Sequence, residues 1–358
     1  MRKKSTSTPR PQRLIAKIGL NLSQKAYMAG SRHHVIPRFL QKGFASRIED
    51  KKVFTYQYRK GLEPAERSTK DLGVERHFYG RNGEPNVDDK ITLLEDLYYV
   101  PLLERLRAKS SQTGVVLVDE PLVADFISHL CTRTKNFRES FYQSMDYCIA
   151  AIDNYFSDFS KIKSFLIKYP AKTEDLIKLK AALASSPEIL DSKKIELESF
   201  FQSLFIFIKS ELPRLVKQSH NHTLINISSP PIIVDSCRRM SWFLYSFNKP
   251  SVILGDSGCL FEITGLTNYK TFYGKDEKIK QVFLPITTNK LLIGAIYGTP
   301  KINIKKLNRE MAKCSQDFFI YSEFSEGMAK LTSLIGTESG ILNQVDLEQI
   351  ISEALQSY

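Results

Sequence analysis

The sequence predicts an α+β protein: a small α/β N-terminal part, a helical middle and an antiparallel β-rich C-terminal part closed by helices. Three observations support this fold class. The 358 residues are 42% hydrophobic and 25% charged, which is typical of folded proteins and excludes collagen-like or low-complexity chains. Helical periodicity dominates residues 120–218, and after about residue 220 short β-prone runs alternate with Gly, Pro, Asn and Asp.

The excess of positive charge, +12 for the whole chain, is concentrated at the N-terminus. Eleven of the 51 basic residues precede Glu49, the first acidic residue, so the remaining 40 nearly balance the 39 acidic ones. We expect residues 1–30 to form a basic, flexible arm, because the first twelve residues offer almost nothing apolar to bury. Such an arm can contact the phosphate backbone of nucleic acid. A solvated tail without a partner and an organelle transit peptide are the alternatives.

Residues 31–330 are expected to form a single α+β domain. In its first part, residues 38–44 predict a helical turn after Pro37, and the alternating residues 53–58 predict a strand. A turn is expected over residues 81–85. Apolar residues recur at helical spacing from 91 to 106, with Pro101 as a candidate kink.

The middle of this domain is predicted to be helical, whereas its end is predicted to contain mainly strands. Asp119 and Glu120 before Pro121 indicate the start of a helix. Residues 185–187 predict a break in the helical region, and residues 195–215 predict a second long helix. Strands are predicted at 224–227, 241–247, 252–254, 280–284 and 291–297. Helices are predicted at 307–320 and at 346–355, the latter within a C-terminal helical tail over 331–358.

The compartment is expected to be the cytoplasm. No apolar run is long enough for a membrane span, and no apolar stretch typical of a signal peptide follows the basic start, so no membrane partner is expected. The five cysteines show neither a CxxC pair nor zinc-ligand spacing, which favours reduced, core-filling thiols.

Several sequence segments, taken in order, carry a family resemblance. They are residues 32–44, the aromatic strand 53–58, residues 73–79, a helix carrying Glu95, residues 133–138, Trp242, and residues 255–257, 284–286 and 307–322. Together they resemble a bacterial family known as domain of unknown function 4238, over about residues 32–323. This chain has Lys135 and Ser257 where the family usually has Pro and Asn. The resemblance implies no established chemistry; it associates the chain with bacterial defence against phage or with toxic effectors.

His33 and His34 are the first candidates for catalysis. Two adjacent imidazoles followed by Val-Ile-Pro are similar to the start of the His-Me finger nuclease motif. In that motif one histidine activates water for attack on a phosphodiester, while a neighbouring ligand holds a divalent metal. The alternative is structural: one histidine caps the helix that starts after Pro37 and bonds a backbone carbonyl.

Glu75 and His77 are candidate metal ligands. Two residues apart, they would share one face of a strand, and with His34 they could hold Mg²⁺ or Mn²⁺ or form an acid–base pair. The alternative is an exposed ion pair between Glu75 and a neighbouring Arg or Lys.

Asp256 is the third catalytic candidate, because it lies between glycines at the end of an apolar strand, where a general base or metal ligand can project. The alternative is a turn in which its carboxylate accepts hydrogen bonds from nearby N–H groups.

Four further residues are candidates for binding. Arg38, Arg133 and Arg138 carry guanidinium groups that suit phosphate or carboxylate, although pairing with acids inside the fold is the alternative. Asn308 is interpreted as a buried amide that ties a helix to the sheet. His129 lies on an apolar helix face and is interpreted as a satisfied core residue.

Two functions from different classes follow. The first is a nucleic-acid-directed phosphoester hydrolase, a nuclease-like effector of phage defence with His34 as general base. The second is a non-enzymatic sensor or partner-binding module, in which these polar residues are structural; a protein partner or a homo-oligomer fits this class. No P-loop, dinucleotide-binding, GxSxG, HExxH or kinase motif is present, which disfavours those activities.

Overall fold

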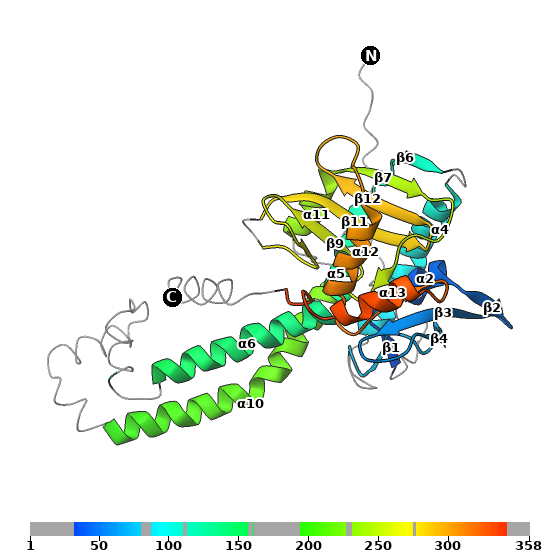
Figure 1. Ribbon diagram of the computed structural model, residues 1–358. Coiled ribbons are helices and arrows are strands. Elements are labelled where there is room, and N and C mark those ends of the chain that lie inside the picture. The colour runs from blue at the N-terminus through cyan, green and yellow to red at the C-terminus, as the bar shows by residue number, and fades with distance from the viewer. Residues whose placement is uncertain are drawn as a thin grey trace, which may run out of the picture.

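The computed structural model describes residues 32–79, 87–109, 113–156, 160, 194–226, 231–274 and 277–341. The predicted arm at 1–30, the turn at 81–85, the break at 185–187 and the helix at 346–355 lie outside the described residues. Helices and antiparallel sheets alternate along the chain, which confirms the α+β class (Figure 1).

The larger sheet has six strands in the order β10-β9-β11-β12-β7-β6, and every neighbouring pair is antiparallel. Strands β11 and β12 form a hairpin in this sheet. β11 is largely buried and β12 is wholly buried, which explains their nearly continuous apolar sequence. The strands are β6 (Gly114–Val118), β7 (Ser241–Ser246), β9 (Leu260–Ile263), β10 (Tyr269–Lys270), β11 (Ile279–Thr287) and β12 (Lys290–Ala295).

The second sheet joins the two ends of the described chain. Its order is β2-β3-β13-β8, with β4 paired to β3 outside this path. Because β3 pairs with β13, residues near 55 and 320 share one sheet, and the ring of Tyr58 stacks on that of Phe319 at 5.0 Å. The strands are β2 (Arg47–Glu49), β3 (Lys52–Arg59), β4 (Ala65–Ser68), β8 (Leu254–Gly255) and β13 (Phe318–Tyr321). A two-stranded ribbon of β1 (Arg32–His34) and β5 (Val74–Arg76) completes the pairing.

The N-terminal helical predictions are confirmed. Helix α2 (Arg38–Gln41) continues into a 3₁₀ turn at Lys42–Phe44. The helical path predicted at 91–106 runs through α3 (Val87–Leu94), a π-helical turn (Glu95–Tyr99) and α4 (Val100–Ala108). The wider turn directly precedes Pro101, which has no N–H group for a regular helical bond.

Helix α5 (Val123–Arg133) is buried along its whole length. Helix α11 (Pro231–Arg238) and the start of α6 (Lys135–Phe156) contact it. Helices α6 and α10 (Lys194–Asn226) form a hairpin that extends away from the sheets (Figure 1). Since α5 has no exposed face, each of its polar side chains must find a partner inside the protein.

Two sequence predictions differ from the structure, and two elements of the structure were not predicted. The strand predicted at 224–227 is wrong, because residues 224–226 are the last of α10, whose packing on α6 outweighs a short β-prone run. The helix predicted at 307–320 is α12 (Ile304–Cys314) alone, and Phe318–Tyr321 form β13 between two strands. Strand β6 and helix α11 were not predicted.

Two adjoining hydrophobic clusters fill the body, one around α5 and the larger sheet and one beneath α12. All five cysteines are free, and four of them are buried. Among the described residues, no helix combines the length and the apolar character needed to cross a membrane.

Candidate functional site

The β1–β5 ribbon places the two adjacent histidines on opposite faces. In its register His33 is opposite Glu75, and His34 is opposite Val74. His33 is 3% exposed, and its Nδ1 accepts a hydrogen bond from the backbone N–H of Tyr79 at 3.1 Å. The ribbon therefore confines His33 to the interior and leaves His34 only partly covered.

The hydrogen bond of His34 determines its tautomer. Its Nδ1 lies 3.2 Å from the carbonyl oxygen of Leu72, which can only accept, so Nδ1 carries the proton and Nε2 carries a free lone pair. No described residue forms a hydrogen bond with Nε2. Burial, followed by the charges of Arg38, Arg133 and Arg32, lowers the pKa of His34 to about 4, against the opposing effect of the Leu72 bond. The imidazole is therefore neutral at pH 7.

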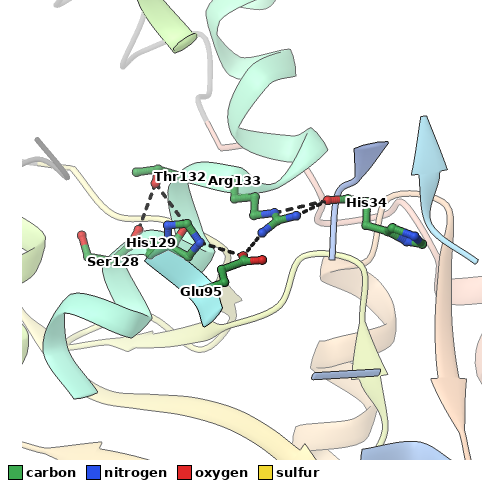
Figure 2. Close-up of polar contacts among 6 residues, drawn as sticks. All are labelled: His34, Glu95, Ser128, His129, Thr132 and Arg133. Atoms are coloured by element: carbon green, nitrogen blue, oxygen red, sulfur yellow. Dashed lines mark hydrogen bonds and ion pairs between the residues drawn. The ribbon is translucent and has the colours of Figure 1, made fainter. Parts of the chain in front are cut away.

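Arg133, at the end of α5, connects this histidine to the core (Figure 2). Its Nε and Nη2 donate to the main-chain oxygen of His34 at 3.2 and 2.7 Å, and its Nη1 pairs with Glu95. Figure 2 shows the His34 ring directed away from the guanidinium, so the arginine positions the strand and not the ring. Arg133 thus follows the prediction that it pairs with an acid inside the fold.

Glu95 is shared between Arg133 and a second α5 residue, His129. The Nε2 of His129 lies 3.0 Å from Oε1 of Glu95, and burial lowers the pKa of His129 to about 4. A neutral imidazole facing a carboxylate must donate, so Nε2 carries its proton. This agrees with the interpretation of His129 as a satisfied core residue. Glu95 projects from the π-helical turn, which sequence spacing alone does not reveal.

Asp88 of α3 and Tyr79 lie next to His33. Burial raises the pKa of Asp88, while its electrostatic interactions with His33 and Arg133 act in the opposite direction. The Tyr79 ring is 5.2 Å from the His33 ring, and Arg133 lies 5.9 Å from the Tyr79 ring centroid. Sequence reasoning did not select Asp88 as a site residue, because an acid in the first turn of a helix is ordinary.

Glu75 and His77 do not share a strand face. Strand β5 ends at Arg76, and His77 has a positive φ of 56°, a left-handed conformation that stops the strand. His77 is exposed, and Glu75 pairs with Lys135 at 3.5 Å. The alternative of an ion pair therefore describes Glu75 better than metal ligation does. In the described ranges, no group of three or more His, Cys, Asp or Glu residues is placed to hold a metal ion.

Asp256 accepts three backbone hydrogen bonds. Its oxygens receive the N–H groups of Gln316 and Asp317, both at 2.6 Å, and of Phe318 at 3.0 Å. Burial raises its pKa to about 7, and the three N–H donors act in the opposite direction by favouring the anion. With three N–H donors on its two oxygens, Asp256 is better described as the brace of the turn between α12 and β13 than as a catalytic base.

Arg138 and Asn308 also use their polar atoms inside the protein. The Nε of Arg138 donates to Nδ1 of His220 at 3.0 Å, and its guanidinium lies 3.5 Å from the Phe78 ring centroid. Asn308 donates to the Ser251 carbonyl at 2.8 Å and accepts from the Ile253 N–H at 3.2 Å, which fits its interpretation as a tie between helix and sheet. Arg138 pairs with a histidine and not with the expected acid.

The exposed rim of the site is cationic. Arg38, the first residue of α2, is exposed and forms no hydrogen bond or ion pair with any described residue. Arg32 bonds Asp71 at 2.6 Å on the surface, and Arg76 lies opposite Arg32 in the ribbon. The helix cap expected of one histidine is absent, since the cap of α2 has no side-chain bond, whereas the expected carbonyl bond is made by His34 to Leu72.

These features define an α+β protein with a neutral histidine between a buried arginine–glutamate–histidine network and an exposed arginine rim. A family model described as "protein of unknown function (DUF4238)" matches residues 32–325, so the chain belongs to this family. The match includes the ribbon, α5 and the Asp256 turn. No curated protein and no solved structure matches the chain.

Proposed function

We propose that this chain is a phosphoester hydrolase directed at nucleic acid, with His34 as its general base. The tautomer of His34 is the observation that carries the proposal. Because the Nδ1 proton is directed to Leu72, the Nε2 lone pair is left to accept a proton from water. The bond from Arg133 to the main-chain oxygen of His34 holds the strand in place.

The arginine rim supplies the complementary charge for a phosphate. Arg38 is exposed, and Arg32 forms only a surface ion pair, which can exchange for a phosphate at little cost. Guanidinium groups bind phosphate oxygens in a bidentate geometry. Both arginines are close enough to His34 to lower its pKa, so a phosphate held by them would lie near the imidazole.

The proposed reaction is hydrolysis by direct attack of water. The water oxygen bonds to phosphorus, and Nε2 of His34 takes one water proton. The bond from phosphorus to the leaving oxygen breaks, and that oxygen leaves with the bonding electrons and takes up a proton from solvent. With a pKa of about 4, His34 is a weak base in the free protein. A bound phosphate would raise this pKa, since its negative charge favours the imidazolium, and a pKa nearer the working pH makes proton transfer more effective.

We also propose that the hydrolase uses Mg²⁺ or Mn²⁺ bound near the substrate phosphate. The described residues offer no complete ligand set. Mg²⁺ is often held by one or two carboxylates together with substrate phosphates. Glu75 would be the carboxylate, after exchange of its pair with Lys135, and the exposed His77 follows it two residues later.

A binding module without catalysis is the second candidate. It is favoured by the internal engagement of Asp256, Arg138 and Asn308, whose polar atoms are bonded within the protein and so are not available for catalysis. Such a module would bind a phosphate backbone through the rim and the basic residues of 1–30, and signal to a protein partner.

The two candidates are separated by measuring cleavage and binding together. Fluorescently labelled single- and double-stranded DNA and RNA are incubated with the full chain in Mg²⁺, in Mn²⁺ and in EDTA. We expect cleavage by the wild-type protein, and a loss of about 100- to 10,000-fold in His34→Ala, the usual contribution of a general base. The exposed His222 provides the matched control His222→Ala, which should cleave normally.

Anisotropy with the same oligonucleotides reports binding. His34→Ala should still bind, Arg38→Ala should bind more weakly, and deletion of residues 1–30 should reduce the salt dependence of binding. Binding without cleavage by the wild-type protein would establish the binding module instead. If the wild-type protein neither bound nor cleaved any of these polymers, that result would overturn the proposal. For the proposed role in phage defence, His34→Ala should lose protection in a plaque assay that the wild-type protein passes.

A further inference from the structure

Strand β6 is an edge of the six-stranded sheet and has no charge to protect it. It pairs with β7 on one side, and no described strand pairs with the other. Its sequence from Gly114 to Val118 is Gly-Val-Val-Leu-Val, without Lys, Glu or Pro. Natural edge strands usually carry such residues, because their unpaired N–H and C=O groups otherwise recruit another strand.

Both faces of β6 are apolar and accessible. Val115, Val116 and Leu117 are 43%, 39% and 64% exposed. Val116 is opposite Leu244, which is opposite Leu292, and both of these leucines are completely buried. Val116 is therefore the last residue of an apolar row that runs across the sheet through Leu244 and Leu292. A strand added at the edge would extend this row.

We propose that β6 pairs antiparallel with β6 of a second copy of this chain, about a twofold axis at Val116. In this register Val116 is opposite itself, and Val115 of one copy is opposite Leu117 of the other. Apolar residues then meet apolar residues on both faces, and the two six-stranded sheets become one continuous sheet. A strand of this length that is apolar and centred on one residue is self-complementary, as a twofold interface requires.

The charges at the two ends of β6 favour a second copy as the partner. At the Thr113 end, Lys109 directly follows α4, and Thr113 bonds Asn248, which is next to Lys249. At the other end, Asp119 is exposed and forms no ion pair with a described residue, whereas Glu120 is engaged by Arg105. The twofold axis brings the Asp119 end of each copy to the lysine end of the other, which favours antiparallel self-pairing.

Light scattering coupled to size exclusion tests the assembly of the full chain. The wild-type protein should show twice the monomer mass of 41.0 kDa and should dissociate on dilution, since only five residues pair. Leu117→Lys and Val115→Lys should be monomers with unchanged melting temperature, because both positions are exposed. The matched control is Phe207→Lys on α10, 63% exposed, which should remain a dimer. A wild-type monomer at every concentration, or a dimer lost only in Phe207→Lys, would overturn the proposal.

Disulfide trapping tests the register. In a Cys148→Ser background, which removes the one native cysteine that is not buried, Val116→Cys should form a covalent dimer under mild oxidation, because opposite residues approach within disulfide range. Thr113→Cys should not, because Thr113 is opposite Asp119 of the other copy. Trapping at 113 but not at 116 would contradict the twofold register.

Discussion

The guanidinium of Arg133 holds the main-chain carbonyl oxygen of His34, with Nη2 at 2.7 Å and Nε at 3.2 Å. The same group pairs with Glu95, which His129 also contacts. One side chain at the end of a buried helix thus connects strand β1 to two other elements. The position of the neutral His34 imidazole depends on this bond from Arg133. Variants of the network therefore test both stability and function.

Breaking this network should be costly. Arg133→Met would leave Glu95 as a buried carboxylate with His129 as its partner, and we expect the free energy of unfolding to fall by about 3–5 kcal/mol. The double variant Arg133→Met/Glu95→Met should lose less than the sum of the single changes, because it removes both charges. Urea denaturation measures each value. Arg105→Ala, which breaks an ion pair with a half-exposed arginine, is the control and should cost less than about 1 kcal/mol.

Three histidines should make the fold sensitive to acid. Burial, aided at His34 and His220 by nearby arginines, lowers the pKa of His34 and His129 to about 4 and of His220 to about 3, from an ordinary value of 6.5. The unfolded chain therefore binds more protons below pH 6.5, and the free energy of unfolding falls as the pH falls from 6.5 toward 4. Each histidine contributes a slope of up to about 1.4 kcal/mol per pH unit.

Urea denaturation of histidine variants at several pH values between 7 and 5 tests this slope. His220→Gln should reduce it, because glutamine takes up no proton in the unfolded chain. Equal slopes for the wild-type protein and His220→Gln would contradict the assignment.

Lys135 should tolerate proline. It is the first residue of α6, where the missing N–H of proline costs little, and Thr134 before it has the extended backbone that proline requires (φ −70°, ψ 156°). Lys135→Pro removes the partly exposed pairs with Glu75 and Asp317, but it also restricts the unfolded chain. We expect a change in the free energy of unfolding within about 1 kcal/mol. Asn136→Pro, one residue later, is the control and should destabilise more, because Asn136 is buried and its amide bonds two carbonyls.

Asp256→Asn should act on stability. An amide can present only one oxygen to the three N–H groups of residues 316–318, so at least one donor loses its partner. We expect a loss of about 2–4 kcal/mol in the free energy of unfolding, given the strength of hydrogen bonds to charged groups. Asp317→Asn, on the surface, should cost less than about 1 kcal/mol. A fully stable Asp256→Asn protein without hydrolytic activity would instead support a catalytic aspartate.

Much of the fold was predictable from local patterns. The alternation at residues 53–58, the helical stripe at 91–106 and the β-prone runs at 241–247, 280–284 and 291–297 correspond to elements of the structure. The errors occur where local preference is weak or divided. Phe318–Tyr321 became a strand because β3 and β8 lie on either side of it, and residues 224–226 stayed helical because α10 packs on α6.

The candidate site was predictable only in part. Some of the residues selected for their chemical type do share one region, since His33 is opposite Glu75 in the ribbon and Arg133 bonds the main-chain oxygen of His34. Their roles could not be read from spacing. Glu95 and Asp88 reach this region through helices whose relative placement depends on packing far along the chain.

The sequence by itself determined the α+β class, the position of the charge excess, the family and the residue types from which a site can be made, because these depend on local pattern and composition. Tertiary structure decided which polar groups form hydrogen bonds inside the protein and which remain free to contact a ligand. A buried carboxylate or guanidinium must be satisfied wherever the fold places it, and Asp256 and Arg138 are satisfied internally. His34 keeps a free lone pair because the turn before β5 directs the carbonyl of Leu72 toward its other nitrogen.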